Sequence, residues 1–174
     1  MNIRAQGDPR KLALVMKSIF IITQTPLGET ALSRTPSFNW AEIDSILGIK
    51  GTINGNEIQF TIPRPDKIME DGVEFPPFMG TASTINFQPT DIRVIVSGYF
   101  VLLANEVAPV TRTLTSYSIG ITAQYSQSTN ESPRIVFLHF LGFDDAGHLA
   151  DGIKAALDNI GKVKKSGKSK SQKE

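Results

Sequence analysis

The stretch ITAQYSQSTNESPRIVFLHF, residues 121–140, is typical of two β-strands joined by a polar loop. Apolar, β-branched and aromatic residues lie on both sides of the loop, and the loop itself holds Ser, Asn and Pro. The pattern predicts strands over 118–127 and 134–142 that pair as a hairpin. If the hairpin closes through the loop, the cross-strand neighbour of His139 is expected near Thr122.

The residues before this hairpin extend the same antiparallel arrangement. Asn54-Gly55 tolerates the positive φ of a tight turn and predicts a hairpin within 51–64. The segments STINFQ and IRVIVSGYFVLL predict a second hairpin, and the second segment, 92–103, is apolar enough to be central and covered on both faces. The stretch RPDKIMEDGVEFPPFMG, 64–80, is expected to be an edge or loop, because its Pro76-Pro77 pair cannot donate to a sheet.

Three segments have helical periodicity. WAEIDSIL follows the cap residue Asn39, and ANEVAPVTRTLTSYS follows the apolar strand. Pro109 fits only a first turn, so we expect that second helix to start late or to bend. The third helix is capped by Asp144 or Asp145 and is stopped by Gly161. The order of elements predicts an α+β fold, with an antiparallel sheet of β-hairpins and two or three helices packed on it.

The length of 174 residues fits one folded domain, which we place at 40–161. Residues 1–39 form an N-terminal extension with a Thr-, Ser- and Pro-rich linker. The tail 162–174 holds six lysines and one glutamate, a charge of +5, and its polarity predicts disorder. Since the whole chain has a formal charge of +1, residues 1–161 carry −4, so nothing indicates a specific nucleic-acid partner.

The N-terminal run RKLALVMKSIFIITQT resembles the start of a secretion signal, but Lys17 interrupts it and no small-x-small cleavage site follows. No stretch approaches 18 consecutive apolar residues, so no transmembrane segment is predicted. The chain has no cysteine, which excludes disulfides, thiolate metal sites and a lipid-modified cysteine. A structural helix or strand and a cytoplasmic location are the favoured expectations, and the compartment stays open.

Signatures of nucleotide binding and of common hydrolases are absent: no GxGxxG, GxxxxGK[ST], GxSxG or HExxH motif occurs. Two histidines are present. His148 is expected on the surface of the last helix. His139 fits three interpretations: a hydrogen-bonded imidazole in the core, part of a ligand pocket, or a catalytic base. Glu106 at a helix start either complements the helix dipole or supplies a polar contact to His139.

Five sequence blocks occur in an order that resembles one family. They are FTIPR (60–64), DGVEFPPFMG (71–80), NEVAPV (105–110), PRIVFLHF (133–140) and LADGIKAALD (149–158). Together they resemble the LppY/LpqO family of uncharacterised bacterial proteins, which is named for mycobacterial lipoproteins. The resemblance covers about residues 40–160. It implies no established activity, although many relatives look exported.

The resemblance also implies that a polar cluster has been lost. Relatives typically carry a His-Asn-His segment just before the Pro-Arg block, a plausible metal-binding or acid–base cluster. The matching positions here hold Tyr125, Ser126 and Gln127, while the later histidine persists as His139. Neutral tyrosine and glutamine are poor metal ligands. His139 would then be a remnant kept for packing or for a small polar pocket, without metal or other cofactor.

Three functions remain as hypotheses. The leading one is a non-catalytic protein that binds a small molecule or a protein partner. The second is an enzyme or metal-dependent protein whose pocket joins His139, Tyr125, Gln127 and Glu106, with His139 as general base. The third is a structural module in which a sheet edge near 57–62 pairs between copies, giving a homo-oligomer.

Overall fold

The structure of the chain is a computed structural model, and it describes residues 7–24, 39–126 and 130–161. Part of the extension and linker predicted within 1–39, namely residues 25–38, lies outside the described residues, and so do the predicted tail 162–174 and Gln127. The chain divides into two compact units, Met1–Arg34 and Thr35–Glu174. The first contains helix α1 (Pro9–Ile22), whose first turn is capped by the Asp8 carboxylate. No helix in the described part of the chain is long and apolar enough to cross a membrane.

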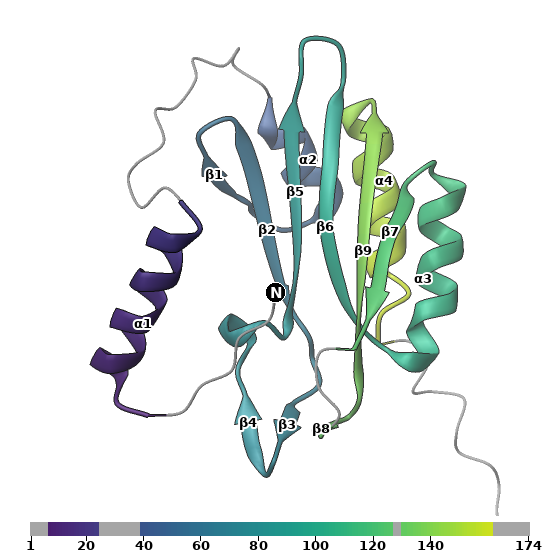
Figure 1. Ribbon diagram of the computed structural model, residues 1–174. Helices are drawn as coiled ribbons and strands as arrows, with labels where there is room; N and C mark the ends of the chain where they lie inside the picture. The colour runs from purple at the N-terminus through teal and green to yellow at the C-terminus, as the bar shows by residue number, and fades with distance from the viewer. Residues whose placement is uncertain (1–6, 25–38, 127–129, 162–174) are drawn as a thin grey trace, which may run out of the picture. The chain divides into compact units, whose positions relative to one another are not determined.

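The second unit is built on a six-stranded sheet in which every neighbouring pair is antiparallel (Figure 1). The strand order is β1-β2-β5-β6-β9-β7. The strands are β1 (Thr52–Asn54), β2 (Glu57–Pro63), β5 (Ala82–Pro89), β6 (Val94–Leu103), β7 (Gly120–Tyr125) and β9 (Ile135–Asp144). The α+β fold predicted from the hairpin pattern is therefore confirmed.

The hairpin predicted from residues 121–140 is present as β7 and β9. His139 pairs with Ala123, one residue from the expected neighbour Thr122. A bulge between Ile121 and Ala123 causes this difference, because it adds one residue to β7 without a partner on β9. The predicted Asn54-Gly55 turn is also present, with Gly55 at φ 64° between β1 and β2.

The proline-rich excursion forms more structure than the sequence predicts. It contains β3 (Ile68–Glu70), β4 (Val73–Phe75) and the 3-10 helix η1 (Pro77–Met79). Together with β8 (Glu131–Ser132), strands β3 and β4 make a second, three-stranded sheet in the order β4-β3-β8. The Pro76-Pro77 pair lies after β4 and therefore does not interrupt these strands.

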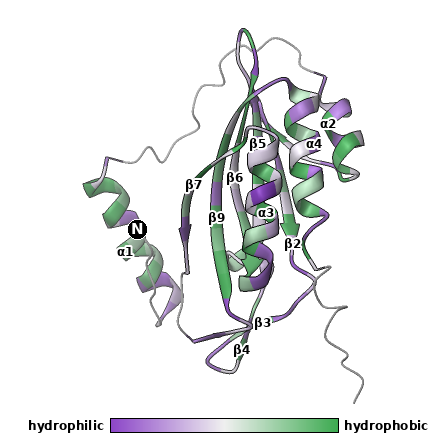
Figure 2. Ribbon diagram, turned by 90° about the vertical axis from the view of Figure 1, so that its right-hand side faces the viewer, coloured by the Kyte–Doolittle hydropathy of each residue, from purple (hydrophilic) through white to green (hydrophobic). Residues whose placement is uncertain are grey.

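Three helices cover one face of the six-stranded sheet (Figure 2): α2 (Trp40–Leu47), α3 (Ala104–Ser116) and α4 (Ala146–Leu157). The main core lies between the helices and the sheet. It includes Ile43 from α2, Val110 and Leu114 from α3, Ile153 from α4, and Phe60, Phe87, Phe100 and Phe140 from the strands. Alternation along each strand places these aromatic rings on the same face.

Two helix boundaries differ from the sequence prediction. Helix α3 does not start late, because it begins at Ala104 and contains Pro109 as its sixth residue. Glu106 stabilises this early start by accepting the Leu103 N–H at 2.8 Å. Helix α4 is capped by Asp145, as expected, but ends at Leu157, well before Gly161.

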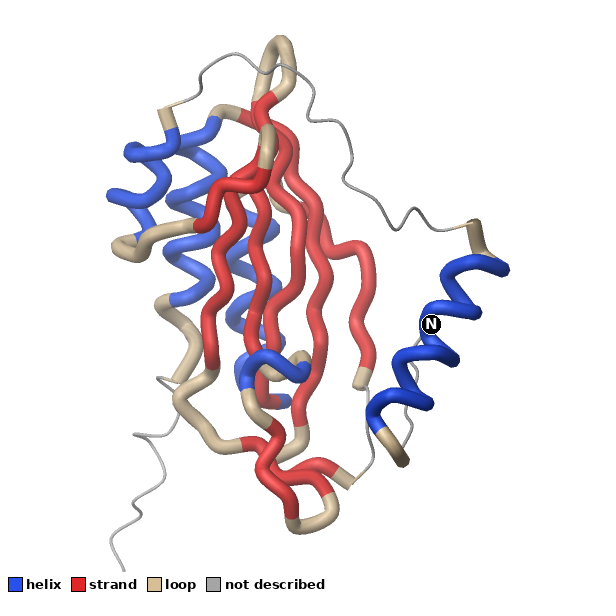
Figure 3. The backbone as a smooth tube through the Cα atoms, turned by 90° about the vertical axis from the view of Figure 1, so that its left-hand side faces the viewer, coloured by secondary structure: helices blue, strands red, loops and turns tan. Residues whose placement is uncertain are grey.

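The opposite face of the sheet carries no α-helix from the described part of this unit. Figure 3 looks onto that face, where η1 and the small sheet lie only across one end. A second, smaller core of Ile68, Val101, Ile135 and Phe137 fills that end. Strand β6 is central in the sheet, as predicted. Both of its faces are covered only at the end with the smaller core, because Ile95, Ser97 and Tyr99 are half-exposed on the open side.

Candidate functional site on the open sheet face

The side chain of His139 points away from the three helices. Its neighbours Leu138 and Phe140 belong to the core under the helices, whereas Phe137 belongs to the smaller core on the opposite side. Successive residues of a strand alternate between faces, so His139 shares the face of Phe137. It is half-exposed there. His139 is therefore neither sealed in the core nor fully in solvent.

Tyr125 and His139 form the centre of this site. The Tyr125 hydroxyl lies 3.2 Å from His139 Nε2, and the two rings stack at 5.5 Å with an angle of 22° between their planes. Tyr125 also stacks on Phe137, with centroids 5.5 Å apart and nearly parallel planes. Tyr125 as a residue is 40% exposed, so part of this amphipathic side chain is accessible from outside.

A fourth ring, that of Tyr99, also belongs to the cluster. Tyr99 is directly opposite His139 on β6, with centroids 5.3 Å apart, and it lies 5.7 Å from Phe137. Its hydroxyl is 3.3 Å from the Thr84 hydroxyl on the next strand. Each phenol is thus within hydrogen-bonding distance of one neighbour and retains capacity for another hydrogen bond.

Two cross-strand rows extend from this cluster over what we call the open face. The first row is Ala123, His139, Tyr99, Thr84 and Thr61, and the second is Leu141, Ser97, Asn86 and Gln59. Within the second row, Gln59 donates to Asn86 at 2.9 Å. Neither row contains an Asp, Glu, Lys or Arg residue. Hydroxyl, amide, imidazole and aromatic groups therefore dominate this surface.

Glu106, the other candidate residue that the structure describes, is placed in a different environment. It is 2% exposed and accepts hydrogen bonds from Arg64 (2.7 and 3.2 Å), Leu103 N (2.8 Å) and Gly161 N (2.8 Å). Both carboxylate oxygens are thus used. The structure brings Tyr125 and His139 together and ties Glu106 to other partners, at the start of α3 and beyond the end of α4.

The sequence alone did not single out Arg64, the counter-charge of Glu106. Its guanidinium also donates to Asp66 at 2.8 Å and to the Val101 carbonyl at 2.7 Å, with only 2% of the side chain exposed. The one available signal was an arginine placed directly after the apolar strand FTIP. Pairing with a residue 42 positions away leaves no trace in local periodicity.

The electrostatics of this pair follow from burial and hydrogen bonding. Burial alone would raise the pKa of Glu106, but hydrogen bonds from Arg64, Leu103 and Gly161 hold it below its ordinary value. Burial alone would lower the pKa of Arg64, while Glu106 and Asp66 together raise it. Both groups are therefore charged near neutral pH, and the cluster joins the ends of β2, α3 and α4.

The capacity of the described residues for metal binding is limited. No group of three or more His, Asp or Glu side chains that could hold a metal ion occurs in 7–24, 39–126 and 130–161. The ring of His139 has two phenol rings as neighbours, those of Tyr99 and Tyr125. His148, on α4, is exposed as expected and contacts the ring of Tyr117 at 5.3 Å.

Comparison of the sequence with known protein families gave a match. A family model described as Domain of Unknown Function (DUF1259) matches residues 41–159, which include the Tyr125–His139 hairpin, Arg64 and Glu106. No similar chain was found among the curated proteins, and none among the solved structures. The match spans well over half of the sequence. The chain belongs to this family of domains of unknown function.

Proposed function

We propose that this chain is a non-catalytic binding protein and that the open face around Tyr125 and His139 is its binding surface. The observation that carries the proposal is the Tyr125 hydroxyl beside His139 Nε2, in an aromatic cluster that is only half-covered. Small-molecule sites combine aromatic surface with a few polar groups that fix orientation. This cluster has both.

The chemistry of the open face favours an uncharged ligand with several hydroxyl groups, such as a sugar. The side chains of Thr84, Ser97, Asn86 and Gln59 both donate and accept hydrogen bonds. The exposed part of the Tyr125 ring offers a flat surface for the C–H groups of a pyranose. A charged ligand would find no Asp, Glu, Lys or Arg as a counter-charge in either cross-strand row.

Within its family, we further propose that the chain is a relative of the LppY/LpqO proteins with a degenerate histidine cluster. In this proposal Tyr125 occupies the place of a family histidine next to His139. Gln127, outside the described residues, would occupy the place of the second. Support comes from the short contact between Tyr125 and His139, since an imidazole at position 125 would bring two ring nitrogens near one site.

One observation favours a second candidate, an acid–base enzyme. A tyrosine hydroxyl 3.2 Å from an imidazole nitrogen is the geometry through which a proton passes between the two groups. In this alternative His139 is the base and Tyr125 the group that positions or relays its proton. Turnover of any ester, sugar or amide substrate that disappears in His139→Ala, with the fold intact, would establish this alternative over the binding proposal.

The assembly hypothesis concerns the sheet edge. Strand β1 covers Glu57–Gln59 of β2, so the free edge of β2 begins only at Phe60. Light scattering across protein concentrations tests whether copies pair there. A constant monomer mass would remove this function, and a dimer that is lost on placing a proline at Thr61 would support it.

A thermal-shift panel of neutral sugars, small carboxylic acids and divalent metals tests the binding proposal. We expect a neutral sugar to raise the melting temperature and to lose affinity about tenfold in Tyr125→Phe and in His139→Gln, as removal of one hydrogen bond predicts. A separate Tyr–His contact, Tyr117 with His148 on the helix side, supplies matched controls. Equal losses in Tyr117→Phe and His148→Gln would contradict the assignment.

A further inference from the structure

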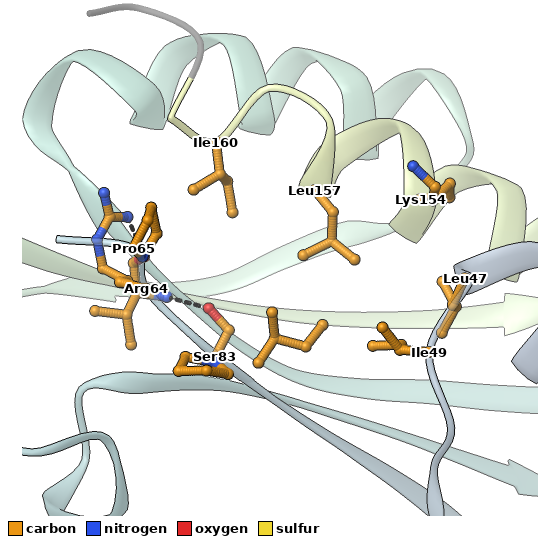
Figure 4. Close-up of a pocket in the computed structure, with 11 residues that line it drawn as sticks. Leu47, Ile49, Arg64, Pro65, Ser83, Lys154, Leu157 and Ile160 are labelled. Carbon is orange, nitrogen blue, oxygen red and sulfur yellow. Dashed lines mark hydrogen bonds between the residues drawn. The ribbon is translucent and has the colours of Figure 1, made fainter.

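A cavity lies on the helix side of the sheet, away from the open face. Its volume is about 240 Å³, and it opens between the end of β2, the last turns of α4 and the loop after α2 (Figure 4). Its walls are mainly aliphatic. The lining residues are Ile62 of β2, Leu157 at the end of α4, Ile160 after α4, Leu47 at the end of α2 and Ile49 in the loop after α2. A cavity with such walls is poorly suited to water and suited to a hydrocarbon.

Two cations border this cavity, at opposite ends in Figure 4. Both terminal nitrogens of Arg64 donate to protein acceptors, Glu106, Asp66 and the Val101 carbonyl, so this cation already has two carboxylate partners within the protein. Lys154 is different. Its ammonium donates to Asp158 at 2.6 Å, its side chain is 39% exposed, and two of its three N–H donors remain after that bond.

We propose that this cavity binds the alkyl chain of a medium-chain carboxylate, with the carboxylate at Lys154. An apolar cavity of about 150 Å³ accommodates benzene, so a volume of 240 Å³ has room for a chain of about six to ten carbons. The chain would run from Lys154 past Leu157 towards Ile160, which is the direction of the apolar lining in Figure 4. The site is independent of the open face, because it lies on the other side of the sheet.

The charge pattern decides between ligands of similar shape. At one end of the cavity, Lys154 is partly exposed, is paired with one carboxylate and keeps two N–H donors, whereas at the other end the buried Arg64 is already paired with two carboxylates. A ligand with one anionic head and an uncharged tail matches this asymmetry. A diacid or a dication would place a second charge against aliphatic side chains, which is unfavourable.

Calorimetric titration of the full chain with octanoate tests the proposal, with octan-1-ol as the uncharged analogue. We expect saturable binding of octanoate, at least tenfold weaker in Leu157→Trp, which fills the cavity. In case that variant does not fold, Ile49→Phe narrows the same cavity from the loop side. We expect Lys154→Gln to weaken octanoate about tenfold and to leave octan-1-ol unchanged.

Controls outside the cavity make the result specific. Lys67→Gln removes another lysine that is paired with a carboxylate, Glu74, at 2.8 Å, and Ile92→Trp adds an indole at an exposed site. Both should bind octanoate like the unmodified chain. The proposal is overturned by the absence of saturable octanoate binding, or by binding that survives both Leu157→Trp and Ile49→Phe. Equal weakening of octanoate and octan-1-ol in Lys154→Gln would overturn the role of the lysine.

Discussion

Two polar clusters of the molecule, Arg64 with Glu106 and Tyr125 with His139, differ in their burial and in how many of their polar atoms are hydrogen-bonded. Arg64 and Glu106 are both almost fully buried, and both oxygens of the carboxylate and both terminal nitrogens of the guanidinium have partners. Tyr125 and His139 share a single hydrogen-bonding contact on a partly exposed face of the sheet, and both keep unused hydrogen-bonding capacity. A polar cluster that is closed on itself holds the fold together, whereas one that is open is available to a ligand.

The difference arises from what each face of the sheet packs against. On the helix side, burial makes an unpaired charge costly, so Glu106 is retained only with a complete set of donors. On the open face, water satisfies whatever the protein leaves unpaired, so a phenol and an imidazole can be kept without closing the network. Substitutions in the two clusters should therefore have opposite effects on stability and on binding.

The largest effect is expected for Glu106→Gln. This change keeps the shape of the side chain but leaves Arg64 without its nearest counter-charge, which should reduce the free energy of unfolding by about 3 kcal/mol. Urea unfolding measures the loss. As a control, Glu74→Gln breaks the exposed ion pair with Lys67 and should cost at most about 1 kcal/mol. Similar losses in the two variants would contradict a structural role for the buried cluster.

The next effect is a pH dependence of stability. The folded-state pKa of Glu106 is below its value in the unfolded chain, about 4.3. Its contribution to stability is thus complete above about pH 4.3 and is lost as the pH falls through the folded value. In Glu106→Gln, the decrease in the free energy of unfolding that comes from protonation of Glu106 at acid pH should be absent. Unfolding curves at successive pH values measure both proteins, and identical acid-side slopes would contradict the assignment.

The smallest effect on stability is expected in the open cluster. Tyr125→Phe and His139→Gln remove one exposed hydrogen bond each, so the free energy of unfolding should change by less than about 1 kcal/mol. The same two changes should abolish or weaken ligand binding, as proposed above. A loss of stability comparable to that of Glu106→Gln would show that this pair is structural.

Much of the fold was predictable from sequence, because strands show an alternation of apolar and polar residues and are bounded by turn residues. The hairpins and the Asn54-Gly55 turn follow from local patterns. The small sheet did not, because its strands have only two or three residues each and flank prolines. The early start of α3 depends on the Glu106 cap and on packing of Val110 and Leu114, which outweigh the single proline.

The candidate site was predictable in part. Direct pairing placed His139 opposite a residue near Thr122, and in the structure His139 pairs with Ala123 while Tyr125 pairs with Phe137. A tyrosine is long enough to reach the diagonal neighbour two residues along the facing strand, and its hydroxyl does so. The Arg64 partnership could not be predicted, since it depends on three elements meeting at one end of the sheet.

Metal content of the purified, unmodified chain tests the central claim most directly, because that claim describes the open cluster as a metal-free binding surface. Elemental analysis of protein prepared without chelators should find only substoichiometric zinc, iron, copper, nickel or manganese. The paired substitution Tyr125→His with Gln127→His should gain one ion per chain, and each single change should not. One tightly held transition-metal ion in the natural protein, lost in His139→Ala, would contradict the account.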